Sequence, residues 1–157
     1  MNYWLLKNEP DDFSVDDLAA APGKKTHWDG VRNYQARNFM RDDMRKGDRA
    51  FFYHSNCEVP AVAGIVEIVR EAYPDHTAFD PDDPHFDPRY GPGSDPDEPR
   101  WYMVDVKLVR KLKRPIPLKA IKEHADELEG FHLIQRGSRL SVMMVEPAHW
   151  KLILSLE

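Results

Sequence analysis

Apolar residues recur along the first third of the chain with a spacing that changes from strand-like to helical. Residues 2–7, NYWLLK, mix apolar and polar positions without strict alternation, which predicts a strand buried on both faces. Residues 13–20, FSVDDLAA, predict a short helix, because Ser14 is suited to cap it and Asp17 follows three residues on. Residues 31–44, VRNYQARNFMRDDM, carry apolar positions unevenly along one helical side and predict a second helix.

The middle and the end of the chain contain runs typical of β-strands. Residues 49–54, RAFFYH, predict an aromatic strand after a KGD turn. Residues 61–74 form the longest such run, and Gly64 within it indicates a bulge or a sharp bend. Residues 100–112 alternate in the manner of a strand, and residues 139–145, RLSVMMV, predict another.

Two further segments have helical character, and each begins with a proline that suits the first turn of a helix. They are residues 117–128 and residues 147–156. About five strands with few tight hairpins and several short helices indicate an α+β domain built on a small, highly curved sheet or barrel. With 157 residues, the chain is expected to form a single domain, residues 1–157.

The segment from Asp75 to Arg100 is rich in aspartate and proline. Its six prolines exclude a continuous helix or a central strand. It is also longer than ordinary connections between elements, so it is expected to be either functional or mobile. Its eight acidic residues against two arginines predict an acidic surface.

Charge is distributed unevenly along the chain. The net charge of -5 argues superficially against nucleic acid as a partner. However, the run from Lys107 to Lys122 holds seven basic residues and no acidic one, which predicts a basic face opposite an acidic one. No segment approaches the roughly 20 apolar residues of a membrane span, and the N-terminal residues do not resemble a signal peptide, so we expect a cytoplasmic protein with no membrane partner.

Catalytic and metal-binding signals are weak. The seven histidines contain no H-x-x-x-H or H-x-H pair, and the single cysteine cannot build a cysteine cluster, so neither a metal nor a cofactor is expected. A hydrolytic or small-molecule enzyme that uses His54 with Ser55 or Cys57 stays open as an alternative, although no known nucleophile motif flanks these residues.

The segment WDGVRNYQARN combines aromatic, basic and amide side chains. Trp28 precedes a turn-forming Asp-Gly pair, which predicts an indole exposed on a concave wall. Arg32 and Asn33 lie near a predicted helix start, and Tyr34 offers a second flat ring. This combination suits a planar, polar ligand such as a nucleobase, whereas the alternative is that Trp28 and Tyr34 pack in the core.

Two other clusters place polar groups at the ends of strands. FFYHSN ends in His54, Ser55 and Asn56, and QRGSRLSV places Ser138 and Arg139 at the start of a strand. Polar side chains at strand ends meet at the mouth of a barrel, which favours a shared binding site.

Several segments together resemble the EVE domain family of the PUA-like superfamily. They are NYWLLKNEP, WDGVRNYQARN, GDRAFFYHSN, PAVAGIVEI, the DP pairs at 83–84 and 87–88, WYMVDVKLV and RGSRLSVMMV. These segments run in order over essentially the whole chain, which looks like a stand-alone bacterial version. The resemblance implies a PUA-like pseudo-barrel of about five to six mostly antiparallel strands flanked by short helices, related to YTH and ASCH domains. It also implies a module without enzymatic activity that binds RNA or DNA and holds a flipped, modified base, such as a methylated or hydroxymethylated one.

The resemblance carries a set of ligand-binding positions onto this chain. They are Trp28, Gly30, Val31, Arg32, Asn33 and Tyr34 as one wall, His54, Ser55 and Asn56 as a second, and Ser138 and Arg139 as a third. Residues 7–10 are expected at the rim, where Asn8 stands in place of the serine frequent in the family, so ligand preference is open.

Basic side chains outside the pocket are expected to contact the phosphate backbone. They are Arg37, Lys107, Arg110, Lys111, Lys113 and Arg114. The choice between DNA and RNA, the modification and the oligomeric state stay open at this point, as does a role for the acidic segment as a protein-interaction surface.

Overall fold

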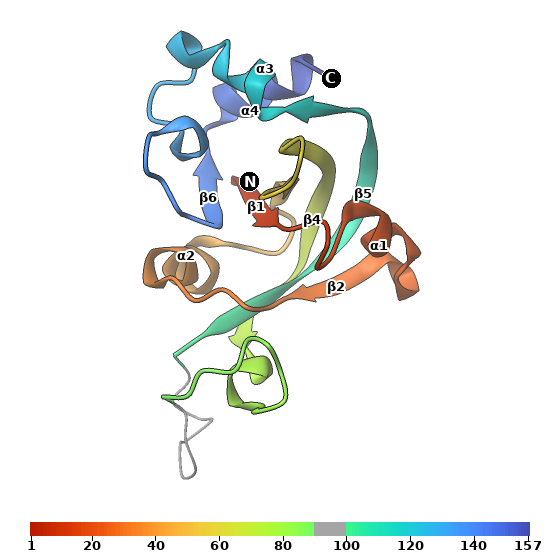
Figure 1. Ribbon diagram of the computed structural model, residues 1–157, viewed down its shortest axis with the longest axis vertical. Coiled ribbons are helices and arrows are strands. Elements are labelled where there is room, and N and C mark those ends of the chain that lie inside the picture. Colours follow the sequence, from red (N-terminus) through yellow and green to blue (C-terminus); the bar gives the residue numbers. More distant parts are fainter. Residues whose placement is uncertain (90–99) are drawn as a thin grey trace.

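A computed structural model describes residues 1–89 and 100–157 of the chain. Six strands form one mixed sheet in the order β2-β5-β4-β3-β1-β6 (Figure 1). The strands are β1 Tyr3–Asn8, β2 Lys25–Trp28, β3 Arg49–His54, β4 Ala61–Pro74, β5 Tyr102–Pro117 and β6 Val142–Val145. The helices are α1 Val15–Ala20, α2 Tyr34–Asn38, α3 Leu118–Lys122 and α4 Pro147–Ser155, joined by five shorter helical turns.

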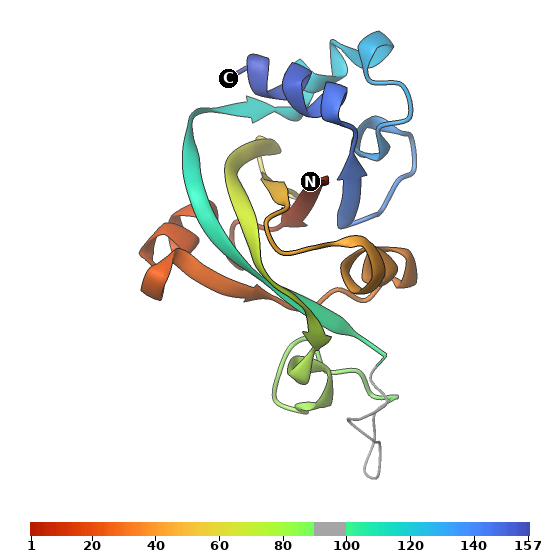
Figure 2. The same cartoon turned by 180° about the vertical axis from the view of Figure 1, so that it is seen from behind.

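The sheet is mostly antiparallel and strongly curved. Only β1 and β3 run parallel, and the other four strand pairs are antiparallel. The long strands β4 and β5 wrap around the centre of the molecule (Figure 2). The edge strands β2 and β6 do not pair with each other in the described part of the chain, so the sheet stays open. The predicted α+β class with a small, highly curved sheet is confirmed.

The parallel strands β1 and β3, neighbours in the sheet, contribute a large part of the core. Leu5 and Leu6 of β1 are fully buried, and so are Phe51 and Phe52 of β3. Neighbouring side chains of a strand point to opposite faces of the sheet, so both faces are covered here. Trp150 of α4 stacks on Phe51, with 3.9 Å between ring centroids. Because both faces of these strands are covered, their sequences are continuously apolar instead of alternating.

Strand β4 bends at Gly64, as its glycine predicts. The register between β4 and β5 shifts between Val62 and Gly64, and a Cβ at Gly64 would lie 2.8 Å from Cγ2 of Val15 in α1. The glycine therefore lets α1 pack directly on the bend.

Helix α1 begins as predicted. The Ser14 side chain accepts a hydrogen bond from the backbone N–H of Asp17, and the Asp17 carboxylate accepts one from the backbone N–H of Ser14. These reciprocal bonds satisfy two donors that the first helical turn would otherwise leave unpaired.

Other boundaries differ from the predicted ones. The helix predicted over residues 31–44 begins at Tyr34, because the Asn33 side chain accepts a hydrogen bond from Ala36 N–H and caps it. Residues 25–28 form β2 against β5, a strand too short to leave a pattern in the sequence. The helix predicted over residues 117–128 is only α3 followed by a short turn, whereas β5 continues to Pro117. Among the helices described, none is long and apolar enough to cross a membrane.

Candidate functional site

A pocket of about 560 Å³ opens where β1 ends beside β2 and the segment around residue 85. We call it the Trp28 pocket. Its lining residues come from four parts of the chain. They are Lys7, Asn8, Asp11, Asp12, Phe13, Thr26, His27, Trp28, Asp29, Gly30, Val31, Pro84, His85 and Ser141.

Trp28 ends β2 and forms part of the pocket wall. Its side chain is largely buried, with 5% of the residue exposed, and its ring meets Phe52 edge-on at 5.2 Å between centroids. Trp28 is therefore a core residue that also lines the pocket, and the prediction of an exposed indole is wrong.

Gly30 brings the backbone close to His85. Its φ of 78° lies in the left-handed region that favours glycine, and a Cβ there would lie 2.6 Å from His85 Nε2. The imidazole therefore packs directly against the main chain at Gly30. Only glycine allows this contact, which fixes one side of the pocket.

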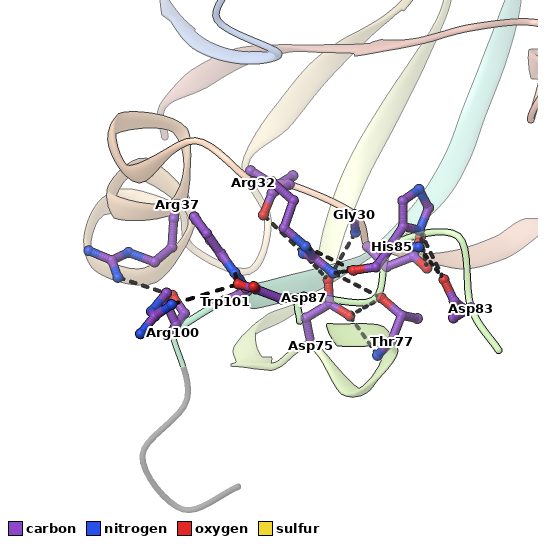
Figure 3. Close-up of polar contacts among 12 residues, drawn as sticks. Gly30, Arg32, Arg37, Asp75, Thr77, Asp83, His85, Asp87, Arg100 and Trp101 are labelled. Carbon is purple, nitrogen blue, oxygen red and sulfur yellow. Dashed lines mark hydrogen bonds and ion pairs between the residues drawn. The ribbon is translucent and has the colours of Figure 1, made fainter. Parts of the chain in front are cut away.

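The carboxylate of Asp75 ties the pocket wall to the segment that follows β4 (Figure 3). Asp75 is fully buried and accepts hydrogen bonds from Gly30 N–H at 2.9 Å and from Arg32 Nη1 at 2.9 Å. Thr77 donates to its other oxygen through both its N–H and its hydroxyl. Burial alone would raise the pKa of Asp75, but the hydrogen bonds from Thr77, Gly30 and Arg32 hold it below its ordinary value.

Arg32 extends this network to His85. Its Nη2 and Nε donate to the carbonyl oxygen of His85 at 2.6 and 3.1 Å. The guanidinium is therefore occupied inside the protein and positions His85, instead of pointing into the Trp28 pocket, which it does not line.

The mouth of the pocket carries titratable side chains. His85 Nδ1 lies 3.5 Å from Asp29 Oδ2 and 3.4 Å from Asp83 Oδ1. Lys7 lies deeper, at the end of β1, where burial lowers the pKa of its ammonium group. The pocket thus offers both a cationic donor and carboxylate acceptors beside the apolar surfaces of Phe13 and Trp28.

Asn8, which the resemblance led us to expect at the rim, lines the pocket. Its side-chain amide donates to the Phe13 carbonyl at 3.4 Å, and its oxygen accepts from Glu9 N–H. These bonds hold Phe13 against the pocket.

The second predicted wall does not line the pocket. His54 Nε2 accepts a hydrogen bond from Val15 N–H, Ser55 N–H donates to the Asn8 carbonyl, and the Asn56 amide donates to Glu9. These residues brace the ends of β1 and α1 from behind.

The rest of the predicted set lies at the start of α2 and around it. Tyr34 is 48% exposed and stacks on Trp101 at 4.9 Å between centroids. Ser138 and Arg139 line a separate cleft with Asn33. Of the predicted ligand-binding residues, the structure brings Trp28, Gly30 and Val31 together in the Trp28 pocket.

Several predicted phosphate contacts are paired within the protein. Arg110 forms two hydrogen bonds with Glu157, which lower the pKa of that carboxyl to about 2. Lys111 pairs with Asp16, and Arg37 donates to the Arg100 carbonyl. Lys107, Lys113 and Arg114 are exposed.

The geometry offers little support for catalysis at His54. Its Nε2 is occupied by a backbone N–H, and the Cys57 thiol points to the His54 carbonyl at 3.8 Å instead of to the ring. Burial also lowers the pKa of His54, so the ring is neutral at neutral pH. Within residues 1–89 and 100–157, no group of three His, Cys, Asp or Glu side chains is arranged to hold a metal ion.

The acidic segment is partly internal. Asp87 accepts a hydrogen bond from Trp101 Nε1 at 2.6 Å and a bidentate contact from Arg89. Arg89 holds the pKa of Asp87 below its ordinary value despite burial, with help from Trp101. The part of the predicted acidic surface that falls on residues 90–99 lies outside the described residues.

Sequence reasoning missed several pocket residues. Phe13, His85 and Ser141 line the pocket, and Asp75 organises it, yet none of these four residues belongs to a motif that predicts a binding site. The two DP pairs near His85 were the available signal, because Asp–Pro pairs initiate turns that can fold a segment back onto the domain.

Comparison with known proteins gives consistent matches over the whole chain. A model of the EVE domain matches residues 2–156. Thymocyte nuclear protein 1 of Mus musculus is 46% identical over 99% of this chain and 74% of its own length. A crystal structure of human THYN1 protein in complex with 5-methylcytosine containing DNA has a TM-score of 0.90 at 45% identity, covering 99% of this chain and 97% of that one. A crystal structure of a Pseudomonas syringae protein has a TM-score of 0.88 at 48% identity, covering 98% of both chains.

Proposed function

This chain belongs to the EVE domain family, and from that premise we propose that it is a non-catalytic DNA-binding protein that holds a modified base in the Trp28 pocket. The observation that carries the proposal is the pocket itself, whose volume of about 560 Å³ suits a small planar ligand. The human relative in complex with 5-methylcytosine containing DNA makes a methylated cytosine the first ligand to test, and DNA the first nucleic acid.

The chemistry of the pocket wall matches a base that has left the helix. Phe13 supplies apolar surface for the ring beside the small exposed part of Trp28, and stacking on an aromatic side chain contributes roughly 1–3 kcal/mol per base. This is of the size needed to offset the few kcal/mol that unstacking a base costs. A methyl group buried against them adds about 0.8 kcal/mol.

Polar groups in the same pocket can orient the base. Lys7 is a donor for the ring nitrogen and carbonyl acceptors of cytosine, and Asp29 is an acceptor for its exocyclic amine. Because these groups lie in a partly enclosed pocket, a base that left them unpaired would bind less well. We therefore expect the pocket to discriminate between bases as well as between modified and unmodified cytosine.

The proposal is non-catalytic because the catalytic pair that the sequence offers, His54 with Cys57, is not assembled. His54 accepts a backbone hydrogen bond, and the Cys57 thiol does not contact the ring. Neither residue lines the Trp28 pocket.

The test is a titration of labelled DNA duplexes carrying one 5-methylcytosine, followed by fluorescence anisotropy. Unmodified DNA and methylated RNA of the same sequence serve as the comparison ligands. The Gly30→Ala variant places a Cβ against His85, so its preference for methylated DNA should fall by roughly tenfold or more. Lys7→Met, which keeps the length of the side chain but removes the donor, should weaken binding to all cytosine ligands.

Gly130→Ala is the matched control for Gly30→Ala. Gly130 has a similar positive φ of 83°, but a Cβ there meets no atom within 4 Å. The control carries the same backbone strain without touching the pocket, and circular dichroism shows whether each variant is folded. Equal affinity of the parent protein for methylated and unmodified DNA and RNA would contradict the proposal.

A further inference from the structure

A second, polar cleft lies between the start of α2 and the segment that follows η5 at His132–Ile134. It has a volume of about 310 Å³, and we call it the Ser138 cleft. The segment from residue 132 to residue 140 lies next to α2 in both views of the fold (Figures 1 and 2). The side chains that line it are mainly amides, guanidiniums and a hydroxyl: Asn33, Gln35, Gln135, Arg136, Ser138 and Arg139.

The two arginines of the cleft have no carboxylate partner among the described residues, unlike several other arginines of the protein. Arg32 pairs with Asp75, Arg89 with Asp87 and Arg110 with Glu157. In the described part of the chain, Arg136 and Arg139 are exposed and form no ion pair or hydrogen bond with a carboxylate. No acidic side chain lines the cleft either. The cleft therefore has a positive charge that nothing within the described protein neutralises.

Ser138 adds a donor that the fold does not use. Its Oγ is buried, and no described protein group lies within hydrogen-bond distance of it. Its backbone N–H donates to the Gln135 carbonyl at 3.2 Å, which closes the turn that carries Arg136. A buried hydroxyl without a partner costs stability, and a ligand in the cleft that accepted its hydrogen bond would remove that cost.

The Ser138 cleft and the Trp28 pocket are close along the chain. Ser138 lines the cleft and Ser141 lines the pocket, while Asn33 lines the cleft and Val31 lines the pocket. Three residues of extended chain span at most about 11 Å, and two span about 7 Å. A single nucleic-acid strand can therefore reach both sites with neighbouring nucleotides.

We propose that the Ser138 cleft binds a backbone phosphate of the DNA strand whose base enters the Trp28 pocket. This inference rests on the proposed function and adds the group that anchors the strand. Arg136 and Arg139 donate charge-assisted hydrogen bonds to the phosphate oxygens, and the Ser138 hydroxyl donates a third. The cleft then positions the strand without reading its sequence, whereas the Trp28 pocket reads the base.

The test measures anisotropy of the same methylated and unmodified duplexes at several salt concentrations between about 50 and about 200 mM. The double variant Arg136→Gln, Arg139→Gln should bind both duplexes roughly tenfold more weakly at the lowest salt. The slope of log affinity against log salt should become shallower by about one. The ratio of affinities for the methylated and unmodified duplexes should stay unchanged, because the Trp28 pocket is intact.

The matched control is Lys119→Gln, Lys122→Gln, which removes two exposed positive charges from α3. If the two double variants weaken binding equally, the cleft is not a phosphate site and the effect is one of net charge. If the parent protein binds DNA and the arginine double variant binds it equally well, the proposal that the Ser138 cleft binds a phosphate is wrong, whereas the proposed function still stands. A parent protein that binds no DNA would overturn the proposed function and the cleft with it.

Ser138→Ala separates a binding role from a structural one. Because Ser138 Oγ has no described protein partner, its removal should leave the thermal midpoint unchanged or raise it, while DNA affinity falls severalfold. A lower midpoint with unchanged affinity would mean that the hydroxyl serves the fold.

Discussion

Asp75 lies fully buried in a segment whose composition predicts an exposed, acidic surface. Its carboxylate joins Gly30, Arg32 and Thr77, and Arg32 in turn holds the carbonyl of His85. One side chain therefore connects three segments that meet at the Trp28 pocket. The contacts explain why a carboxylate at this position is stable when buried, since each oxygen is paired.

The titration of Asp75 should appear in the acid stability of the protein. Its folded pKa is lowered from an unfolded value of about 4, so its contribution is fully present above about pH 4 and is lost as the pH falls through the folded pKa. Asp75→Asn should lower the free energy of unfolding by about 3 kcal/mol at neutral pH. Between neutral and acidic pH, the free energy of unfolding of this variant should fall by less than that of the parent protein. Denaturant titrations at about pH 7 and about pH 3 measure both effects.

Asp82→Asn is the control for this prediction, because Asp82 is exposed in the same segment. It should reproduce the pH dependence of the parent protein. An Asp75→Asn variant with the parent's full loss of stability in acid would mean that other carboxylates carry the effect.

At the level of single residues, the sequence indicated Trp28 and Gly30 of the pocket but not Phe13, His85 or Asp75. Trp28 and Gly30 are recognisable in the sequence because the tryptophan directly precedes a turn-forming Asp-Gly pair. His85 and Asp75 reach the pocket only through tertiary contacts between segments about 45 to 55 residues apart, and no local pattern records such a contact. Arg32 was predicted to face the ligand, but its guanidinium instead bonds to Asp75 and His85.

At the level of elements, the bend of β4 depends on a glycine that α1 covers. A Cβ at Gly64 would lie 2.8 Å from Val15 Cγ2 and 3.2 Å from the Arg110 carbonyl oxygen. Gly64→Ala should therefore lower the free energy of unfolding by about 1–3 kcal/mol, as overpacked cores do. Thermal and denaturant unfolding measure the change.

The double variant Gly64→Ala, Val15→Ala tests whether α1 is the cause. Val15→Ala removes the methyl group that the new Cβ meets, so the two changes together should cost less than the sum of the single ones. Additive losses would point to the Arg110 backbone instead of α1.

The longer elements followed from the sequence, whereas the short ones did not. β1, β3 and the first half of β4 carry apolar runs because these parts are buried, and α1 carries its reciprocal caps in the sequence. β2 has four residues, of which only Trp28 is buried, so it has no recognisable period and forms because β5 offers an edge. After α2 the chain continues as the π-helical turn Phe39–Asp43. The spacing of apolar residues does not distinguish a π-helical turn from an α-helical one, so the sequence did not predict it.

At the level of the whole molecule, the segment after β4 forms a small cluster of its own. Ala78 and Trp101 are buried together with Phe79 packed on them, apart from the main core. Asp87 holds this cluster through the Trp101 indole and Arg89. A small satellite cluster of this kind opens at a lower free energy than the main core.

Asp87→Asn should therefore loosen this region before the rest of the protein. Loss of the charge weakens the bonds from Arg89 and Trp101, so amide hydrogen exchange in residues 76–89 should become faster by roughly tenfold or more. Exchange in β1 and β3 should stay close to that of the parent. Uniformly faster exchange across both regions would show that the cluster and the main core unfold as one unit.

The position of β1 in the sheet has a consequence for how the protein is made. β1 lies between β3 and β6, and Tyr3 pairs with Arg49 on one side and with Val145 on the other. A ribosome therefore releases the first strand long before the second partner of that strand has been synthesised. Until residues 142–145 emerge, one edge of β1 has no partner, and an open strand edge with apolar side chains invites wrong pairing. The nascent chain can complete its sheet only after residues 142–145 have left the ribosome, so this edge of β1 is paired last.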